Sequence, residues 1–201
     1  MLSRRLYEER FKEKVPPILF DVGNIPKKFR EANLEDIPDE CTYKKVINDW
    51  SKNIKKYLDE GRWLFMWGTF GTGKTAAANI LLRETLLHDG SAFMMTQSQL
   101  IDYRINGENG KFGSFSLEQV IVQSNILLLD DIGSSKPNDF TMDCIEWLSV
   151  SRYNAGKSLI LTTNLDPDGT KRKDFITGKV LSMCNELATI VHMSEYNWRN
   201  K

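Results

Sequence analysis

Short apolar runs alternate with amphipathic segments along most of the chain, and this alternation predicts β-strands separated by α-helices. The apolar runs that predict strands are residues 63–67, 91–96, 126–129, 158–162 and 188–193. The segments predicted to be helical are residues 42–60, 74–88, 97–105, 116–124, 139–154 and 173–185. Continuously apolar strands between helices form a mostly parallel sheet that is covered on both faces. The predicted fold class is therefore α/β, a three-layer α/β/α sandwich with a five-stranded sheet.

The composition fits one globular domain without a membrane segment or a metal cluster. Of the 201 residues, 41% are hydrophobic and 27% are charged, and the net charge is zero, so no global field draws the chain to nucleic acid or membrane. No apolar run approaches membrane-spanning length, and the N-terminus lacks the pattern of a signal peptide. Three scattered cysteines and two histidines favour neither disulfides nor a zinc site. We therefore expect a cytoplasmic protein with no membrane and no zinc partner.

The chain divides into a short arm and one domain. Residues 1–24 are the arm, in which residues 2–14 are either a charged helix that docks a partner or a solvated segment, ended by Pro16 and Pro17. Residues 25–201 form the domain. An extended lead-in is predicted at residues 21–38, across the boundary between the arm and the domain.

The strongest chemical signal lies between the first predicted strand and the helix after it. Residues 68–75 read G-T-F-G-T-G-K-T, a phosphate-binding loop pattern. The glycines let backbone N–H groups face phosphate oxygens, and the following helix adds its positive end. Lys74 is placed to neutralise the β- and γ-phosphates of ATP, and the Thr75 hydroxyl to bind Mg²⁺. The predicted nucleotide-binding residues are Gly68, Thr69, Phe70, Gly71, Thr72, Gly73, Lys74, Thr75 and Ala76.

Polar side chains follow two later strands and complete the predicted site. Asp130 and Asp131 end an apolar run, which is typical of a Walker B strand downstream of a phosphate-binding loop. We expect Asp130 to bind Mg²⁺, and Asp131 to orient and activate the attacking water. Asn164, preferred over Thr163, is predicted to contact the water or the γ-phosphate; the alternative is an ordinary turn before Pro167.

These motifs, in this order, resemble the AAA+ ATPases, and their flanks resemble the DnaC/DnaI helicase loaders and the related IstB transposition ATPases. The residues that carry the resemblance are I-P-K-K-F-R at 25–30, L-L-D-D-I-G at 128–133, R-Y-N-A-G at 152–156 and T-T-N-L at 162–165. The resemblance implies an AAA+ core with strand order 5-1-4-3-2 and nucleotide bound between subunits. It also implies single-stranded DNA binding and delivery of a hexameric replicative helicase.

The chain departs from the family's pattern in three places. Only about twenty residues precede the core, where loaders usually carry a larger helicase-binding domain. The stretch that matches the arginine-finger motif has Lys179 and Met183 at the two arginine positions. The chain ends soon after Arg199, which matches the family's sensor 2 arginine, so no C-terminal helical lid is expected. We expect slow ATPase turnover with Lys179 as a partial finger, and Arg152 is either an alternative contact to a neighbouring subunit or a helix-end arginine.

Candidates for single-stranded DNA contact lie between residues 97 and 115, where aromatic and basic side chains are mixed. Rings can stack on bases and cations can contact phosphates. The alternative is that the rings pack inward and the cations are solvated. The candidates are Tyr103, Arg104, Lys111, Phe112 and Phe115, and residues 171–173 are a second basic cluster.

The leading hypothesis is an ATP-dependent DNA replication helicase loader, and its reduced size suggests that a phage or plasmid encodes it. Such a protein binds ATP with Mg²⁺, single-stranded DNA and a replicative DNA helicase, and forms a homo-oligomer when ATP or DNA binds. Two alternatives stay open: a transposition regulatory ATPase of the IstB type, and an adaptor that uses ATP as a switch with little turnover. The partner protein separates the first two, and turnover with and without DNA separates the third.

Overall fold

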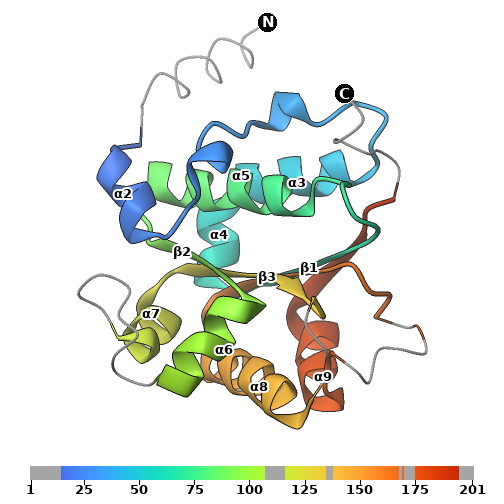
Figure 1. Ribbon diagram of the computed structural model, residues 1–201. Helices are drawn as coiled ribbons and strands as arrows, with labels where there is room; N and C mark the ends of the chain where they lie inside the picture. Colours follow the sequence, from blue (N-terminus) through green and yellow to red (C-terminus); the bar gives the residue numbers. More distant parts are fainter. Residues whose placement is uncertain (1–14, 107–115, 135–137, 168, 170–174, 195–201) are drawn as a thin grey trace, which may run out of the picture.

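A parallel sheet of five strands organises the structure, in the order β2-β3-β4-β1-β5 (Figure 1). The computed structural model describes residues 15–106, 116–134, 138–167, 169 and 175–194. Every neighbouring pair of strands is parallel, which confirms the predicted α/β class and the order 5-1-4-3-2. The strands are β1 (Trp63–Trp67), β2 (Ala92–Thr96), β3 (Ile126–Ile132), β4 (Ser158–Thr163) and β5 (Ala188–His192).

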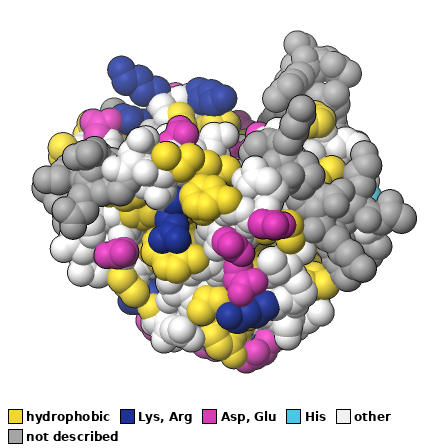
Figure 2. All heavy atoms as spheres, turned by 60° about the horizontal axis from the view of Figure 1, so that its bottom comes forward, with side chains coloured by type: hydrophobic (Ala, Val, Ile, Leu, Met, Phe, Trp, Pro, Cys, Tyr) yellow, Lys and Arg dark blue, Asp and Glu magenta, His cyan; other side chains and the backbone are white. Residues whose placement is uncertain are grey.

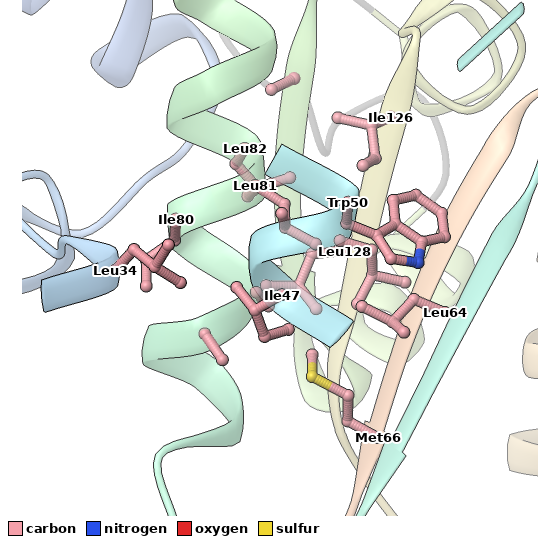
Figure 3. Packing of buried hydrophobic residues seen from close by; sticks show 14 of the residues in the cluster. Leu34, Ile47, Trp50, Leu64, Met66, Ile80, Leu81, Leu82, Ile126 and Leu128 are labelled. Atoms are coloured by element: carbon pink, nitrogen blue, oxygen red, sulfur yellow. The ribbon is translucent and has the colours of Figure 1, made fainter. Parts of the chain in front are cut away.

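Helices from the N-terminal part of the chain cover one face of the sheet. They are α2 (Pro17–Val22), α3 (Tyr43–Lys52), α4 (Ile54–Asp59) and α5 (Lys74–Leu87), with the 3₁₀ turns η1 (Lys27–Phe29) and η2 (Leu34–Asp36). Figure 3 shows Trp50 of α3 and Leu81 of α5 packed over Leu64 of β1. The single helix predicted at residues 42–60 is instead divided in two. α3 ends at Lys52 and α4 begins at Ile54, with Asn53 between them as the cap of both.

Four further helices cover the opposite face (Figure 1). They are α6 (Gln97–Asn106), α7 (Leu117–Gln123), α8 (Asp139–Asn154) and α9 (Gly178–Leu187). Alternate residues of the strands, such as Phe65 and Leu129, face this second core. The central strands are therefore buried on both faces, which explains why their sequences are continuously apolar. None of the helices in the described part of the chain has the length and apolar character needed to cross a bilayer.

The lead-in segment runs along the outer edge of β2. The Met94 N–H donates to the Gly23 carbonyl oxygen at 2.9 Å, and Asn24 Nδ2 donates to the Met94 carbonyl oxygen at 2.8 Å. A Cβ on Gly23 would lie 2.6 Å from the Ala92 carbonyl oxygen, so the close approach requires glycine. The predicted extended lead-in is thus wrong in detail, since α2, η1 and η2 fold the segment back. Residues 2–14, for which a docking helix and a solvated segment were the alternatives, lie outside the described residues.

Candidate functional site

The predicted phosphate-binding loop joins β1 to α5. Gly68, Gly71 and Gly73 have φ angles of 147°, 83° and 88°, and Gly73 caps α5 in a left-handed conformation. A Cβ on Gly68 would lie 2.0 Å from the carbonyl oxygen of Met193, which follows β5, so no other residue fits there. Glycines with positive φ directly before a helix are the backbone that an anion-binding loop at a helix N-terminus requires.

The side chain of Lys74 lies inside this loop. Its Nζ atom donates to the carbonyl oxygens of Gly68 and Thr69, both at 2.8 Å, and the residue is only 7% exposed. A buried ammonium is costly unless oxygen atoms surround it. The loop carbonyls supply those oxygens and hold the positive charge in the hollow of the loop, where a polyphosphate would bind.

Thr75 and Asp130 form the pair expected to hold the metal ion. Thr75 Oγ1 lies 3.0 Å from each carboxylate oxygen of Asp130. Octahedral Mg²⁺ with bonds of about 2.1 Å needs neighbouring oxygen ligands about 3 Å apart, so the pair fits two adjacent coordination positions. Burial raises the pKa of Asp130 above its usual value, against the hydrogen bonds from Thr162 and Thr75, and a nearby cation would favour the ionised form.

A β-bulge brings both carboxylates of β3 to the same pocket. Asp130 and Asp131 together stand opposite the single residue Thr162 of β4. Asp131 also has a positive φ of 61°, which is rare for a residue other than glycine. Successive side chains of a regular strand point to opposite faces, and a bulge changes that alternation. Both aspartates consequently line one pocket with the phosphate-binding loop.

The end of β4 supplies two polar groups to these aspartates. Asn164 Nδ2 donates to Asp131 Oδ1 at 2.9 Å. The Thr162 hydroxyl donates to Asp130 Oδ1 at 2.6 Å and accepts from the Asp131 N–H at 2.9 Å. Thr163, the less favoured sensor candidate, instead donates to the Ile132 carbonyl oxygen. Sequence analysis missed Thr162, although the period of two along a strand would have placed it on the same face as Asn164.

The pocket between these elements has a volume of about 530 Å³. Its walls combine the loop, the two aspartates and Asn164 with residues to which the sequence analysis gave no role in nucleotide binding. Those residues are Pro26, Lys28 and Phe29 from the lead-in, Met94 and Thr96 from β2, and Thr162. The fold therefore builds the predicted site and adds a wall from the N-terminal segment.

The predicted finger Lys179 lies away from this pocket. Its Nζ atom is 3.3 Å from Glu146 Oε1, beside a separate hollow of about 370 Å³ between α6, α8 and α9. The Thr177 hydroxyl and Lys179 hold the pKa of Glu146 below its usual value. Figure 2 turns this face toward the viewer and shows hydrophobic side chains interspersed with charges of both signs. Lys179 is exposed and its ion pair is weak, so a contact with a neighbouring subunit stays a prediction.

Met183 is the second finger position of the resemblance, and Arg199 is its sensor 2 position. Met183 is 7% exposed and packs in the second core, so it faces inward. Arg199 lies outside the described residues, and its sensor role stays a prediction.

Of the two alternatives for Arg152, only its position at a helix end is confirmed, since it lies in the last turn of α8. Arg152 is 0% exposed, so the predicted alternative of a contact with a neighbouring subunit is wrong. It donates to the carbonyl oxygens of Ile121, Ser124, Asn125 and Ser158 and to the Ser124 hydroxyl. Burial lowers its pKa to about 9, which leaves it charged at neutral pH. Arg152 thus ties the segment between α7 and β3 to the start of β4.

The described part of the DNA candidate segment favours the inward alternative for one residue. Tyr103 packs against the second core, and its hydroxyl accepts the Leu117 N–H at 2.8 Å. Arg104 is exposed, and its guanidinium lies 4.4 Å from the centroid of the Trp147 ring. Lys111, Phe112, Phe115 and residues 171–173 lie outside the described residues. DNA contact by this segment therefore stays a prediction that rests on Arg104 within the described region.

Comparisons with solved structures identify the same fold in proteins of DNA replication. A crystal structure of the DnaC helicase loader is 25% identical, with a TM-score of 0.68 over 84% of this chain and 99% of that chain. A DnaI structure is 17% identical, with a TM-score of 0.70 over 87% of this chain and 94% of that chain. The replication initiator DnaA bound to AMPPCP and single-stranded DNA is 17% identical, with a TM-score of 0.64 over 85% of this chain and 51% of that chain.

These likenesses confirm the resemblance to DnaC and DnaI and the AAA+ fold. A scan against protein-family models and a search of the curated proteins both found no match. The chain therefore has the AAA+ fold of these replication proteins.

Proposed function

From its likeness to DnaC and DnaI, we propose that this chain is an ATP-dependent helicase loader of DNA replication. One observation carries the proposal: a phosphate-binding loop, two aspartates and Asn164 line one pocket of a domain that matches the DnaC structure over 99% of that structure's length. A nucleotide-binding neighbour of the same fold, the initiator DnaA with AMPPCP, is consistent with ATP as the ligand.

The residues of the pocket divide the work of ATP binding. Lys74 and the loop N–H groups hold the phosphates, and Gly68 lets the loop pass close to the Met193 carbonyl oxygen. Thr75 and Asp130 would hold Mg²⁺, which supplies charge neutralisation between the phosphates. Thr162 positions Asp130 by donating a hydrogen bond to it.

Hydrolysis would depend on Asp131 and Asn164. The Asp131 carboxylate accepts from Asn164, which fixes its orientation, and its remaining lone pairs can accept a proton from an attacking water. We propose that turnover is slow, because Met183 is buried and Lys179 offers a point charge in place of an arginine's planar fork. The same observation favours a second candidate function, an ATP-switched adaptor with little turnover.

We further propose that the loader binds a replicative helicase and single-stranded DNA, and that it forms a homo-oligomer when ATP or DNA binds. Arg104 is the described residue proposed for DNA contact, and Lys179 is proposed for contact with the neighbouring subunit's nucleotide. Both side chains are exposed on the face formed by α6, α8 and α9.

The test begins with ATP affinity of the parent protein and of Lys74→Ala. A charge-assisted contact is worth about 1.5–3 kcal/mol, so we expect roughly tenfold to hundredfold weaker binding with the fold intact. Asp131→Asn should bind ATP normally and lose most of its turnover. If Lys74→Ala binds ATP as tightly as the parent does, the nucleotide site is not in this pocket.

The second stage separates the partners. The parent protein and Lys74→Ala are mixed with a hexameric replicative helicase and, in parallel, with an IS-type transposase, with and without ATP, and complexes are resolved by size-exclusion chromatography. A helicase complex that Lys74→Ala weakens supports the loader. Binding to the transposase alone would instead support the transposition ATPase, and ATP binding with neither complex would refute both.

A further inference from the structure

The lead-in segment places at the nucleotide pocket a basic side chain that lies outside the phosphate-binding loop, the Walker B strand and the sensor position. Lys28 of η1 lines the pocket together with Lys74, Thr75 and both aspartates. Its side chain is exposed, and its Nζ atom lies 4.6 Å from the centroid of the Phe29 ring. No carboxylate within the described residues forms an ion pair with Lys28. The cation can therefore move toward a ligand without breaking a salt bridge.

The charges around the pocket favour an additional cation for a triphosphate. Lys28 and Lys74 carry the positive charges of its lining, and Asp130 and Asp131 carry the negative ones, so the lining is formally neutral. ATP keeps a net negative charge after one Mg²⁺ is bound. Lys74 is held at the loop by the Gly68 and Thr69 carbonyls, whereas Lys28 comes from a different element that lines the same pocket.

On the basis of the proposed ATPase function, we propose that Lys28 binds the terminal phosphate of ATP from within the same subunit. It would supply part of the positive charge that the replaced finger positions lack. Because ADP has no terminal phosphate of this kind, Lys28 would also make the lead-in sensitive to which nucleotide is bound.

The lead-in is well anchored on the side away from the pocket, so such a contact would have a fixed support. Arg30 donates from Nε to the Ile25 carbonyl oxygen at 3.0 Å and pairs with Asp21. The guanidinium also lies over the Phe20 ring, 5.5 Å from its centroid. These contacts join η1 to α2, and the Gly23 contact joins both to β2.

The test compares the affinities of the full chain for ATP and ADP, with Mg²⁺ present, in Lys28→Ala and in Lys27→Ala. Lys27 is a matched control, since it is the adjacent exposed lysine of the same turn and does not line the pocket. A charge-assisted contact at a partly exposed site predicts about tenfold weaker ATP binding for Lys28→Ala. ADP affinity should change by less than about threefold, and Lys27→Ala should stay within about twofold for both nucleotides. Lys28→Arg should recover most of the lost ATP affinity.

The outcomes separate this proposal from the proposed function. If the parent protein binds neither nucleotide, both proposals are wrong. If the parent binds ATP and Lys28→Ala keeps its ratio of ATP to ADP affinity, only the role of Lys28 is refuted. Equal weakening by Lys27→Ala and Lys28→Ala would indicate a general charge effect and would also refute it.

Discussion

Thr162 offers the sharpest test of how the site holds its metal-binding carboxylate. Replacing Thr162 by valine removes one hydroxyl and keeps a β-branched side chain that suits β4. Two hydrogen bonds are lost: the 2.6 Å bond to Asp130 Oδ1 and the 2.9 Å bond from the Asp131 N–H. The Thr75 hydroxyl is then the remaining donor that the structure gives Asp130.

The magnitude follows from these two contacts. A hydrogen bond to an ionised group contributes about 1.5–3 kcal/mol, and a buried N–H without an acceptor costs about 1–3 kcal/mol. We expect the loss of the hydrogen bond from Thr162 to weaken metal binding, because that bond fixes the orientation of the Asp130 carboxylate. The Mg²⁺ concentration at half-maximal ATP binding or turnover should therefore rise roughly tenfold or more, since about 1.4 kcal/mol corresponds to a factor of ten.

The neighbouring variant Thr163→Val is the matched control. Its hydroxyl donates to the Ile132 carbonyl oxygen at 2.8 Å, on the face away from the pocket. Both variants should lower the free energy of unfolding in urea titrations, and only Thr162→Val should shift the Mg²⁺ dependence. The reasoning is refuted if the two variants shift the Mg²⁺ titration equally, or if neither shifts it.

Three further predictions concern buried residues. Arg152→Met leaves four carbonyl oxygens without their donor, so we expect the free energy of unfolding to fall by at least about 3 kcal/mol. Thermal melts should show a melting temperature lower by about 6–12 °C, and ATP affinity should be unchanged below the transition. Met183→Arg should not create a finger but should destabilise the protein by about 3 kcal/mol or more, because it buries an unpaired cation. Met183→Leu should cost less than about 1.5 kcal/mol, and thermal melts of both variants would measure the difference. The three cysteines are each 1% exposed, and burial raises the pKa of Cys184 to about 12; they are Cys41, Cys144 and Cys184. A thiol reagent at pH 8 should therefore label the native protein slowly, and it should label all three thiols after denaturation. Rapid labelling of the native protein would contradict this burial.

Much of the fold could be predicted because its signals are local. The apolar runs that became β1, β2 and β4 lie within one residue of their observed bounds, since a strand buried on both faces has a continuous apolar sequence, and β3 extends three residues beyond its predicted end. Ser116 was predicted to begin a helix, and its side chain does accept the Gln119 N–H at the start of α7. The phosphate-binding loop was predictable for the same reason, because eight consecutive residues contain all of it.

The parts that could not be predicted depend on contacts between distant segments. The bulge at Asp131 reflects the register of β3 against β4, and no pattern within β3 alone indicates it. Arg152 lies in the last turn of α8, and α7 and the start of β4 surround it with carbonyl oxygens, which no pattern within α8 indicates. The position of Lys28 at the pocket depends on η1 lying beside α5 and β2, more than forty residues away in the sequence.

The pairing of the lead-in with β2 has a consequence for any shortened form of this protein. An open sheet edge offers unpaired N–H and C=O groups to other chains and promotes aggregation. Gly23 and Asn24 occupy part of that edge through Met94, so a chain that begins after Arg30 would uncover it and remove the Lys28 wall of the pocket at the same time. If a shortened protein precipitates and binds ATP poorly, both defects would follow from the loss of the lead-in, which covers β2 and lines the pocket. Neither defect would then be a property of the complete protein. For the same reason, limited proteolysis within residues 23–30 would impair solubility and nucleotide affinity together.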